Sequence, residues 1–277
     1  MKQLITIVLC LCLIMTSTIT VFAESSASNG RTNSFKNVYE KMDNAHKNIV
    51  KSDLGILDGI GLDENSIVDI NSNAEGKFVY KYQLTPNTTS DISVSEELNG
   101  VLLDITEGYL HNQLLIDDIG DLYLDGFKID FSNAYGGEPS DALKTNYLKT
   151  DWSSTAFTNS TPYSTSSSGS QFNPNLSLGQ TISKITVAAL VAIISIFQPW
   201  IGIAAGVITS IAGNIKTLGE QVYPNATFLS YKLYWYDSTK SQNYIIVYTQ
   251  YKGTFWMQPN YTGTSTNQVA YRRDSYA

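Results

Sequence analysis

Two histidines are the first side chains of this sequence whose chemistry needs explaining. Histidine titrates near neutral pH and can act as an acid, a base or a metal ligand, and the chain has only His46 and His111. His46 borders the apolar side of a predicted helix, and His111 falls in a predicted strand. No HExxH, GxSxG, P-loop or Rossmann glycine pattern accompanies them. We therefore expect ordinary surface or edge histidines and no enzymatic activity.

A group of aspartates is the second feature with chemical potential. Carboxylates at short spacing can bind Ca²⁺ or form an acid–base pair. The spacing does not match the EF-hand loop, which needs oxygen ligands at its first, third and fifth positions. Solvated side chains around turns are the favoured interpretation, and a weak Ca²⁺ site is the alternative. No cofactor and no other metal site are predicted. The aspartates are Asp117, Asp118, Asp121, Asp125 and Asp130.

The N-terminus has the three parts of an export signal. Lys2 provides the positive charge, Leu4–Met15 is apolar, and the small residues Val21 and Ala23 fit a signal-peptidase site. We expect cleavage after Ala23 and a secreted, extracellular protein, with a layout typical of Gram-positive bacteria. Both cysteines lie in the apolar stretch, so the exported form would have no disulfide and no thiolate metal site.

Charge is distributed unevenly along the chain. Residues 24–183 contain 22 acidic and 10 basic residues, a net charge of −12, whereas residues 184–277 contain 7 basic and 3 acidic residues, a net charge of +4. The acidic first half argues against nucleic-acid binding, which depends on neutralising phosphates. Solubility outside the cell is a sufficient alternative explanation for the acidity.

Hydrophobic periodicity predicts an α+β fold, in which a small antiparallel β domain precedes a hydrophobic helical hairpin packed with aromatic β-strands. The clearest hairpin is Asp121–Phe131, because Asp125-Gly126 is a preferred pair for a type I′ turn. The predicted segments are a signal peptide (1–23), a flexible N-terminus (24–34), an amphipathic helix and loop (35–62), an acidic β-rich domain (63–151), a Ser/Thr-rich linker (152–180), and the helical hairpin with a Tyr-rich β segment (181–277).

The predicted hairpin rests on the 31 residues 185–215, which contain no charge. Pro199 suits the first turn of a helix and disrupts a helix interior, so we expect two helices, about 182–197 and 199–218. Small residues recur at every fourth position and create flat faces for close helix packing or self-association. The residues predicted to act in membrane contact or helix packing are Pro199, Trp200, Gly202, Ala205, Gly206, Ser210 and Gly213.

Three environments suit this uncharged run. It can be the buried core of a folded domain, an element that inserts when it meets a membrane, or a permanent anchor. Each half spans roughly 22 Å at about 1.5 Å per residue, less than the roughly 30 Å apolar core of a bilayer. Helices that are apolar all round are either buried in protein or in lipid. The sequence leaves these alternatives open.

The C-terminal part is rich in tyrosine and reads as strands at 228–236 and 244–251. Tyrosine and tryptophan fill cores, but they also serve at membrane interfaces and stack on sugars. The candidates for contact with a partner are Tyr234, Trp235, Tyr236 and Trp256.

The uncharged run 185–215 and the aromatic segment 228–251 resemble those of a loose group of exported Gram-positive proteins, some of them bacteriocin-like. The resemblance implies a non-enzymatic, membrane-directed factor, whose partner is a target membrane or cell surface and whose hairpin inserts in the bilayer. The alternative is a secreted binding or surface protein in which the hairpin is the buried core and the aromatic strands engage a protein or glycan.

Overall fold

The computed structural model describes residues 28–130, 149–158, 162–167, 169–197, 205–238 and 246–275. The predicted signal peptide, 1–23, lies outside the described residues, as do Pro199, Trp200 and Gly202.

An antiparallel meander forms the N-terminal sheet, in which each strand pairs with the next along the chain. Asp125 and Gly126 have φ values of 49° and 82° and join β6 to β7, which confirms the predicted type I′ hairpin at this position. The strands are β1 (Ile67–Ser72), β2 (Phe78–Thr85), β3 (Thr88–Glu97), β4 (Gly100–Glu107), β5 (Leu110–Asp117), β6 (Leu122–Leu124) and β7 (Phe127–Lys128).

Alternation of side chains gives this sheet one buried and one solvated face. Tyr80, Ile92 and Ile105 lie opposite one another on successive strands and are fully buried, whereas the residues between them are polar and more exposed. Helices α2 (Ser28–Lys41) and α3 (Asn44–Gly59) pack near β1 and β2. The Tyr80 hydroxyl donates to Asp53 of α3 at 2.7 Å.

A second antiparallel sheet follows, in the order β8-β12-β11-β10-β9. We call it the C-terminal sheet. Its inner face carries Tyr231 and Phe255, whose rings stack with centroids 5.3 Å apart and which are 3% and 1% exposed. The strands are β8 (Lys149–Ser153), β9 (Gly169–Ser177), β10 (Phe228–Asp237), β11 (Ile246–Gln258) and β12 (Thr262–Ser275).

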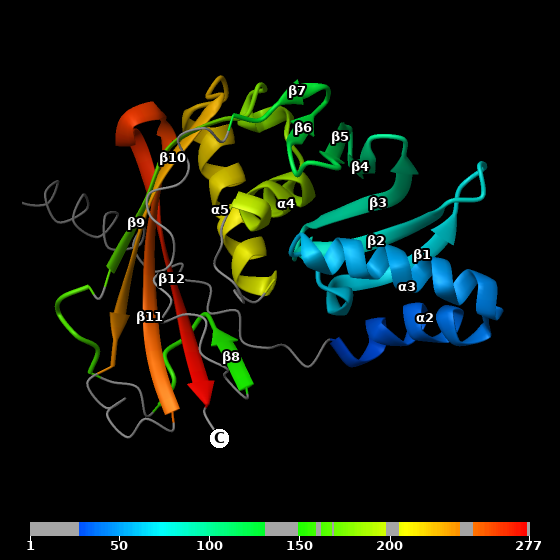
Figure 1. Cartoon of the computed structure of the whole chain (residues 1–277), viewed down its shortest axis with the longest axis horizontal. Helices are drawn as coiled ribbons and strands as arrows, with labels where there is room; N and C mark the ends of the chain where they lie inside the picture. Colours follow the sequence, from blue (N-terminus) through cyan, green and yellow to red (C-terminus); the bar gives the residue numbers. More distant parts are fainter. Residues whose placement is uncertain are drawn as a thin grey trace, which may run out of the picture.

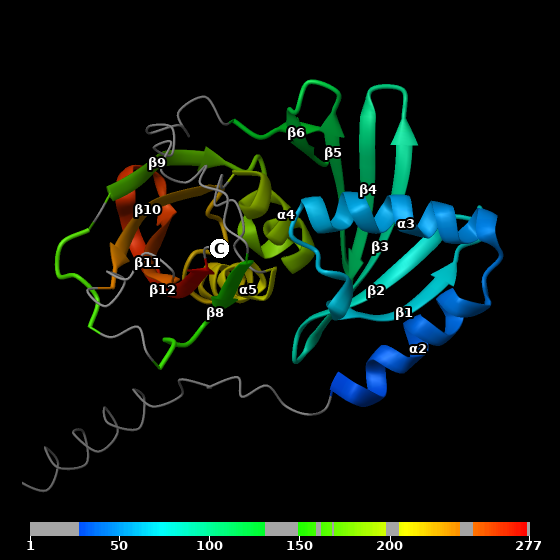
Figure 2. The ribbon, with the colours of Figure 1, turned by 60° about the horizontal axis from the view of Figure 1, so that its bottom comes forward.

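Two helices, α4 (Val187–Phe197) and α5 (Ala205–Val222), pack against each other between the two sheets (Figures 1 and 2). Residues 188–193 of α4 are fully buried. Asn112, on the buried face of the N-terminal sheet, accepts from Thr186 N–H at 2.7 Å, so this face contacts both α3 and the start of α4. None of the described helices combines the length and apolarity that crossing a bilayer requires.

The predicted fold class is wrong. In the described part of the chain the structure is mostly β, with two antiparallel sheets of seven and five strands and four α-helices of 11 to 18 residues. It is not a small β domain followed by a helical hairpin. The apolar run contributes an 11-residue helix and the start of a longer amphipathic one, and together these helices form the layer between the sheets.

The error has a physical cause in strands with polar sequences. β3, the end of β8 and β9 contain few of the aromatic and β-branched aliphatic residues that mark strands. Their pairing is set by neighbours, since β9 adds to β10 and β8 adds to β12. The range 152–180, interpreted from sequence as a linker, therefore contains β9 and the end of β8.

Candidate functional site

A cleft with a volume of about 1060 Å³ lies between the β2–β3 hairpin, the segment that ends β8, and one side of α5. We call it the central cleft. Its wall contains both polar and apolar surface, and eleven of the lining residues carry hydroxyl or amide side chains. These are Ser66, Gln83, Thr85, Thr88, Ser153, Ser154, Thr155, Thr209, Ser210, Asn214 and Thr217.

The sequence of α5 places a polar stripe along the cleft. Apolar residues at 207, 208, 211, 212 and 215 are buried, whereas Gly206, Ser210, Asn214 and Thr217 are exposed and line the cleft. This spacing of three and four residues is the amphipathic pattern of a helix with one face in the core. The α5 helix thus supports the core with one side and forms a wall of the cleft with the other.

Trp152 provides a large apolar surface among the lining residues. Its ring lies 5.3 Å from the ring of Tyr251, and the Arg272 guanidinium lies 5.7 Å from its centroid. The Arg272 side chain is held in turn by Asp274, whose Oδ1 accepts from Nε at 2.8 Å. Both of these charged residues are buried. The indole is therefore fixed in orientation at the cleft by cation–π and ring contacts.

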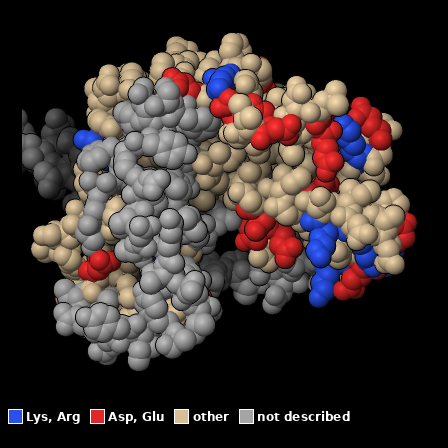
Figure 3. All heavy atoms as spheres, viewed as in Figure 1, with Lys and Arg blue, Asp and Glu red and all other residues tan. Residues whose placement is uncertain are grey.

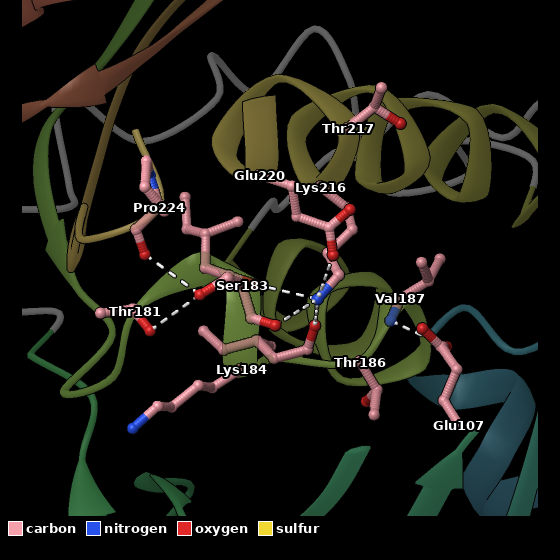
Figure 4. A network of polar contacts seen from close by, with 12 residues as sticks. Glu107, Thr181, Ser183, Lys184, Thr186, Val187, Lys216, Thr217, Glu220 and Pro224 are labelled. Carbon is pink, nitrogen blue, oxygen red and sulfur yellow. Dashed lines mark hydrogen bonds and ion pairs between the residues drawn. The ribbon is translucent and has the colours of Figure 1, made fainter. Parts of the chain in front are cut away.

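Lys216 joins α5 to the turn that precedes α4 (Figure 4). Its Nζ donates to the carbonyl oxygens of Ile182, Ser183 and Ile185 at 3.1, 3.0 and 2.6 Å. It also lies 3.1 Å from Glu220 Oε1, one helical turn away. The Lys216 side chain is only 8% exposed. An ammonium group buried to this extent requires such partners, because an unpaired buried charge is very costly.

Glu107 is the second charged group of the cleft wall. Its Oε2 accepts from the Ser90 hydroxyl at 2.8 Å and from Val187 N–H, the first amide of α4, at 3.0 Å. Burial raises the pKa of Glu107 above its ordinary value, and nearby Glu220 adds to this, whereas the two hydrogen bonds and Lys216 oppose it. The negative charge of this carboxylate at the N-terminus of α4 also interacts favourably with the helix dipole.

The small residues predicted for membrane contact or helix packing have different surroundings. An added Cβ at Gly206 would meet nothing within 4 Å, and Ser210 is exposed to the cleft. A Cβ at Gly213 would lie 3.3 Å from Thr85 Cγ2, so this glycine faces the β2–β3 hairpin. Ala205 is the first residue of α5. Pro199, Trp200 and Gly202 lie outside the described residues.

The four candidate aromatic residues do not share one face. Tyr234, Tyr236 and Trp256 lie on the outer face of the C-terminal sheet, with Lys232 near Trp256 and Lys252 over Tyr236. Trp235 is directly opposite Tyr251 on β11, so it lies on the inner face.

The histidines and aspartates remain apart from the cleft. His46 pairs with Asp43 at 2.7 Å and His111 with Asp104 at 2.9 Å. Asp117 accepts from Ile119 N–H and Asp121 N–H in its own turn. Across the described ranges, no three His, Asp or Glu side chains gather where they could share a metal ion.

Sequence reasoning did not identify Lys216, Glu107 or Trp152 as site residues. A signal was present for Lys216: it follows Ala212 by four residues and precedes Gly219 by three, so it falls on the apolar side of α5. Glu220, four residues further on, is the matching partner. Glu107 and Trp152 have no comparable local signal, because their neighbours come from distant segments.

No protein-family model, no curated protein and no solved structure matches this chain.

Proposed function

We propose that the chain is an exported, non-enzymatic binding protein that holds a neutral oligosaccharide in the central cleft. The observation that carries this proposal is the composition of the cleft wall, where eleven hydroxyl and amide side chains line the same cleft as the fixed indole of Trp152. Export rests on the predicted signal peptide.

Each part of the wall suits a sugar. Hydroxyl and amide groups both donate and accept hydrogen bonds, as sugar hydroxyls do. The apolar face of a sugar ring stacks on an indole, as Trp152 would allow. The wall holds no more than three charged residues, Glu107, Lys216 and Glu220, and each already contacts protein groups. A strongly charged ligand would find little to neutralise it.

The size and rigidity of the cleft also support this ligand class. Ligand pockets commonly have volumes of about 300–1,000 Å³, so a cleft of about 1060 Å³ can hold several sugar units. Lys216 fixes α5 against the turn before α4, and Tyr251 with Arg272 fixes Trp152. Walls that are already ordered lose less conformational entropy on binding.

Binding is favoured over hydrolysis by the state of the carboxylates. A glycosidase needs an acid and a second carboxylate that both reach the scissile bond. Glu107 accepts from Ser90 and Val187 N–H, and Glu220 lies against Lys216. With these groups engaged by the protein, we expect no cleavage of the bound oligosaccharide.

Membrane insertion by residues 185–215 stays a prediction. Insertion would require α4 to leave the core, where residues 188–193 are fully buried. Dye-loaded liposomes test it directly, with the protein lacking residues 1–23 beside a Gly206→Ile variant. Leakage that this variant weakens would support insertion over oligosaccharide binding.

Gly206 offers a direct test of the cleft. Gly206 lines the cleft, and the Cβ of a glutamine there would have room, because no atom lies within 4 Å of an added Cβ. Glutamine is also a better helix former than glycine. We expect cello- or chito-oligosaccharides to bind the wild-type protein in calorimetry. Gly206→Gln should weaken that binding about tenfold or more by occupying the site.

Two controls make the result specific. Gly206→Ala should bind almost as the wild type does, because one methyl group leaves the cleft open. Gly55→Gln places the same side chain at an exposed position of α3, remote from the cleft, and should have no effect. Equal binding by Gly206→Gln and wild type, or no binding of any neutral oligosaccharide, would contradict the proposal.

A further inference from the structure

The outer face of the C-terminal sheet combines aromatic rings with lysines. We call it the cation–aromatic face and define it by Lys232, Tyr234, Tyr236, Lys252, Trp256 and Tyr261. Alternation along β10 and β11 places all of them there except Tyr261, which lies in the turn after β11 with its ring 5.4 Å from that of Trp256. Tyr231 and Leu233 of β10 and Phe255 of β11 are buried against the helices, so their neighbours in sequence point to the opposite side.

Both lysines lie against ring faces. Lys232 Nζ lies 4.3 Å from the ring centroid of Tyr261 and 5.9 Å from that of Trp256. Lys252 Nζ lies 4.5 Å from the centroid of Tyr236. These distances are in the range of cation–π attraction. The ammonium groups are thereby held at fixed positions, although Lys252 is exposed.

The charges around this face leave it positive. Among the described residues of the five strands, the one carboxylate on this side is Asp151 at the β8 edge, and it lies 3.8 Å from Arg273. Asp237 and Asp274 lie on the other side of the sheet. In Figure 3, most of the visible acidic residues lie on the right, over the N-terminal sheet and α3, with lysines among them. The cation–aromatic face is thus separated from the acidic part of the molecule.

Uncharged hydrogen-bonding groups complete the face. Thr254 lies directly opposite Lys232, and Asn267 directly opposite Thr254. The Thr254 hydroxyl donates to Asn267 Oδ1 at 2.7 Å, which leaves the Asn267 amide group as a donor on an exposed side chain. Residues two apart on a strand are about 6.7 Å apart, so rings and lysines repeat along the sheet at short intervals.

We propose that the cation–aromatic face binds an anionic polysaccharide that carries carboxylate groups. The rings stack on sugar rings, the lysines attract the carboxylates, and Thr254 and Asn267 reach sugar hydroxyls. A broad sheet surface suits an extended polymer, in contrast to the central cleft, which encloses its ligand. The proposal does not depend on the function of the cleft.

Polygalacturonate is a suitable probe, because its methyl ester has the same backbone without the charges. In biolayer interferometry we expect the wild-type protein to bind polygalacturonate, and the binding to weaken as salt rises, since salt screens exposed charges. The methyl ester should bind much more weakly. The same protein is tested with single-stranded DNA and with phosphatidylglycerol vesicles.

Variants locate the binding on the sheet. Lys252→Glu changes an exposed side chain and should weaken binding about fivefold. Trp256→Ala should weaken it about tenfold through lost stacking, and its thermal unfolding is measured to confirm that it folds. Lys184→Gln removes an exposed lysine of the turn before α4 and should have no effect. Gly206→Gln should also leave this binding unchanged, which separates the face from the cleft.

Three outcomes would overturn the proposal. The first is equal binding of polygalacturonate and its methyl ester. The second is wild-type affinity in Lys252→Glu. The third is tighter binding of DNA or anionic vesicles than of polygalacturonate, which would assign the face to a different class of partner.

Discussion

Replacing Lys216 with methionine should destabilise the protein markedly. Methionine keeps most of the length and the apolar stem of lysine, but it cannot donate to the carbonyl oxygens of Ile182, Ser183 and Ile185. The side chain is 8% exposed, so water cannot readily take the place of the ammonium group.

The contacts set the size of the effect. Ile182 O keeps the N–H of Ile185 as a donor at 3.2 Å, so the carbonyls of Ser183 and Ile185 lose most. Leaving a buried acceptor without a donor costs about 1–3 kcal/mol. Removing the buried charge also removes its desolvation penalty, which offsets part of this loss. We expect Lys216→Met to lower the free energy of unfolding by about 3 kcal/mol.

Thermal unfolding followed by circular dichroism measures this change. A loss of about 3 kcal/mol corresponds to a fall in Tm of roughly 6–12 °C for a chain of this size. Lys184→Met is the matched control, because Lys184 is exposed and its side chain points away from the network (Figure 4). It should change stability by less than about 0.5 kcal/mol.

The reasoning would be refuted if Lys216→Met and Lys184→Met had the same Tm as the wild type. That result would mean that the three carbonyl groups find other partners without cost, and that α5 is held by apolar packing alone. A small effect of Glu220→Gln would not contradict the account, because the Glu220 side chain is 45% exposed and exposed ion pairs contribute little.

Further predictions concern packing and pH. In urea unfolding, Gly219→Ala should destabilise the protein by about 1–3 kcal/mol, because the added Cβ would lie 2.6 Å from Ile182 Cγ2. Gly55→Ala should stabilise it by about 0.5–1 kcal/mol, because nothing lies within 4 Å of its added Cβ. The opposite order of stabilities would show that the short helix η3 (Ile182–Lys184) can shift. Burial raises the pKa of Glu107 above 4.5 in the folded protein, so the stability linked to its proton is present below 4.5 and lost as the pH rises through the folded value. We measure the free energy of unfolding of wild type and Glu107→Gln from below pH 4.5 to above the folded pKa. The wild type should lose stability relative to Glu107→Gln as the pH rises, and a difference that does not change with pH would contradict the prediction. Burial also raises the pKa of Asp53, so Asp53→Asn should show the same sign.

Local signals predicted part of this fold well. The Asp125-Gly126 turn is confirmed because both residues must adopt positive φ, which this pair does readily. The aromatic strands predicted at 228–236 and 244–251 correspond to β10 and β11. In each case the information is carried by adjacent residues, so no distant contact is needed to read it.

Long-range pairing explains what could not be predicted. The sequence of β9 is polar and reads as a linker, yet it completes the sheet because β10 offers free hydrogen-bonding groups at its edge. The central cleft also depends on contacts between distant segments of the chain. Its wall joins the β2–β3 hairpin, residues after β8 and α5, which are separated by long stretches of chain. Small residues that suggested helix packing instead leave room, as Gly206 does.

Fluorine NMR of protein labelled with fluorotryptophan tests the central proposal most directly. The chain has four tryptophans, Trp152, Trp200, Trp235 and Trp256, and single substitutions to phenylalanine assign their resonances. Titration with cello- or chito-oligosaccharides should shift the Trp152 resonance and leave that of Trp256 unchanged, and Gly206→Gln should abolish the shift. An unshifted Trp152 resonance at saturating oligosaccharide, or a shift confined to Trp256, would contradict binding in the central cleft.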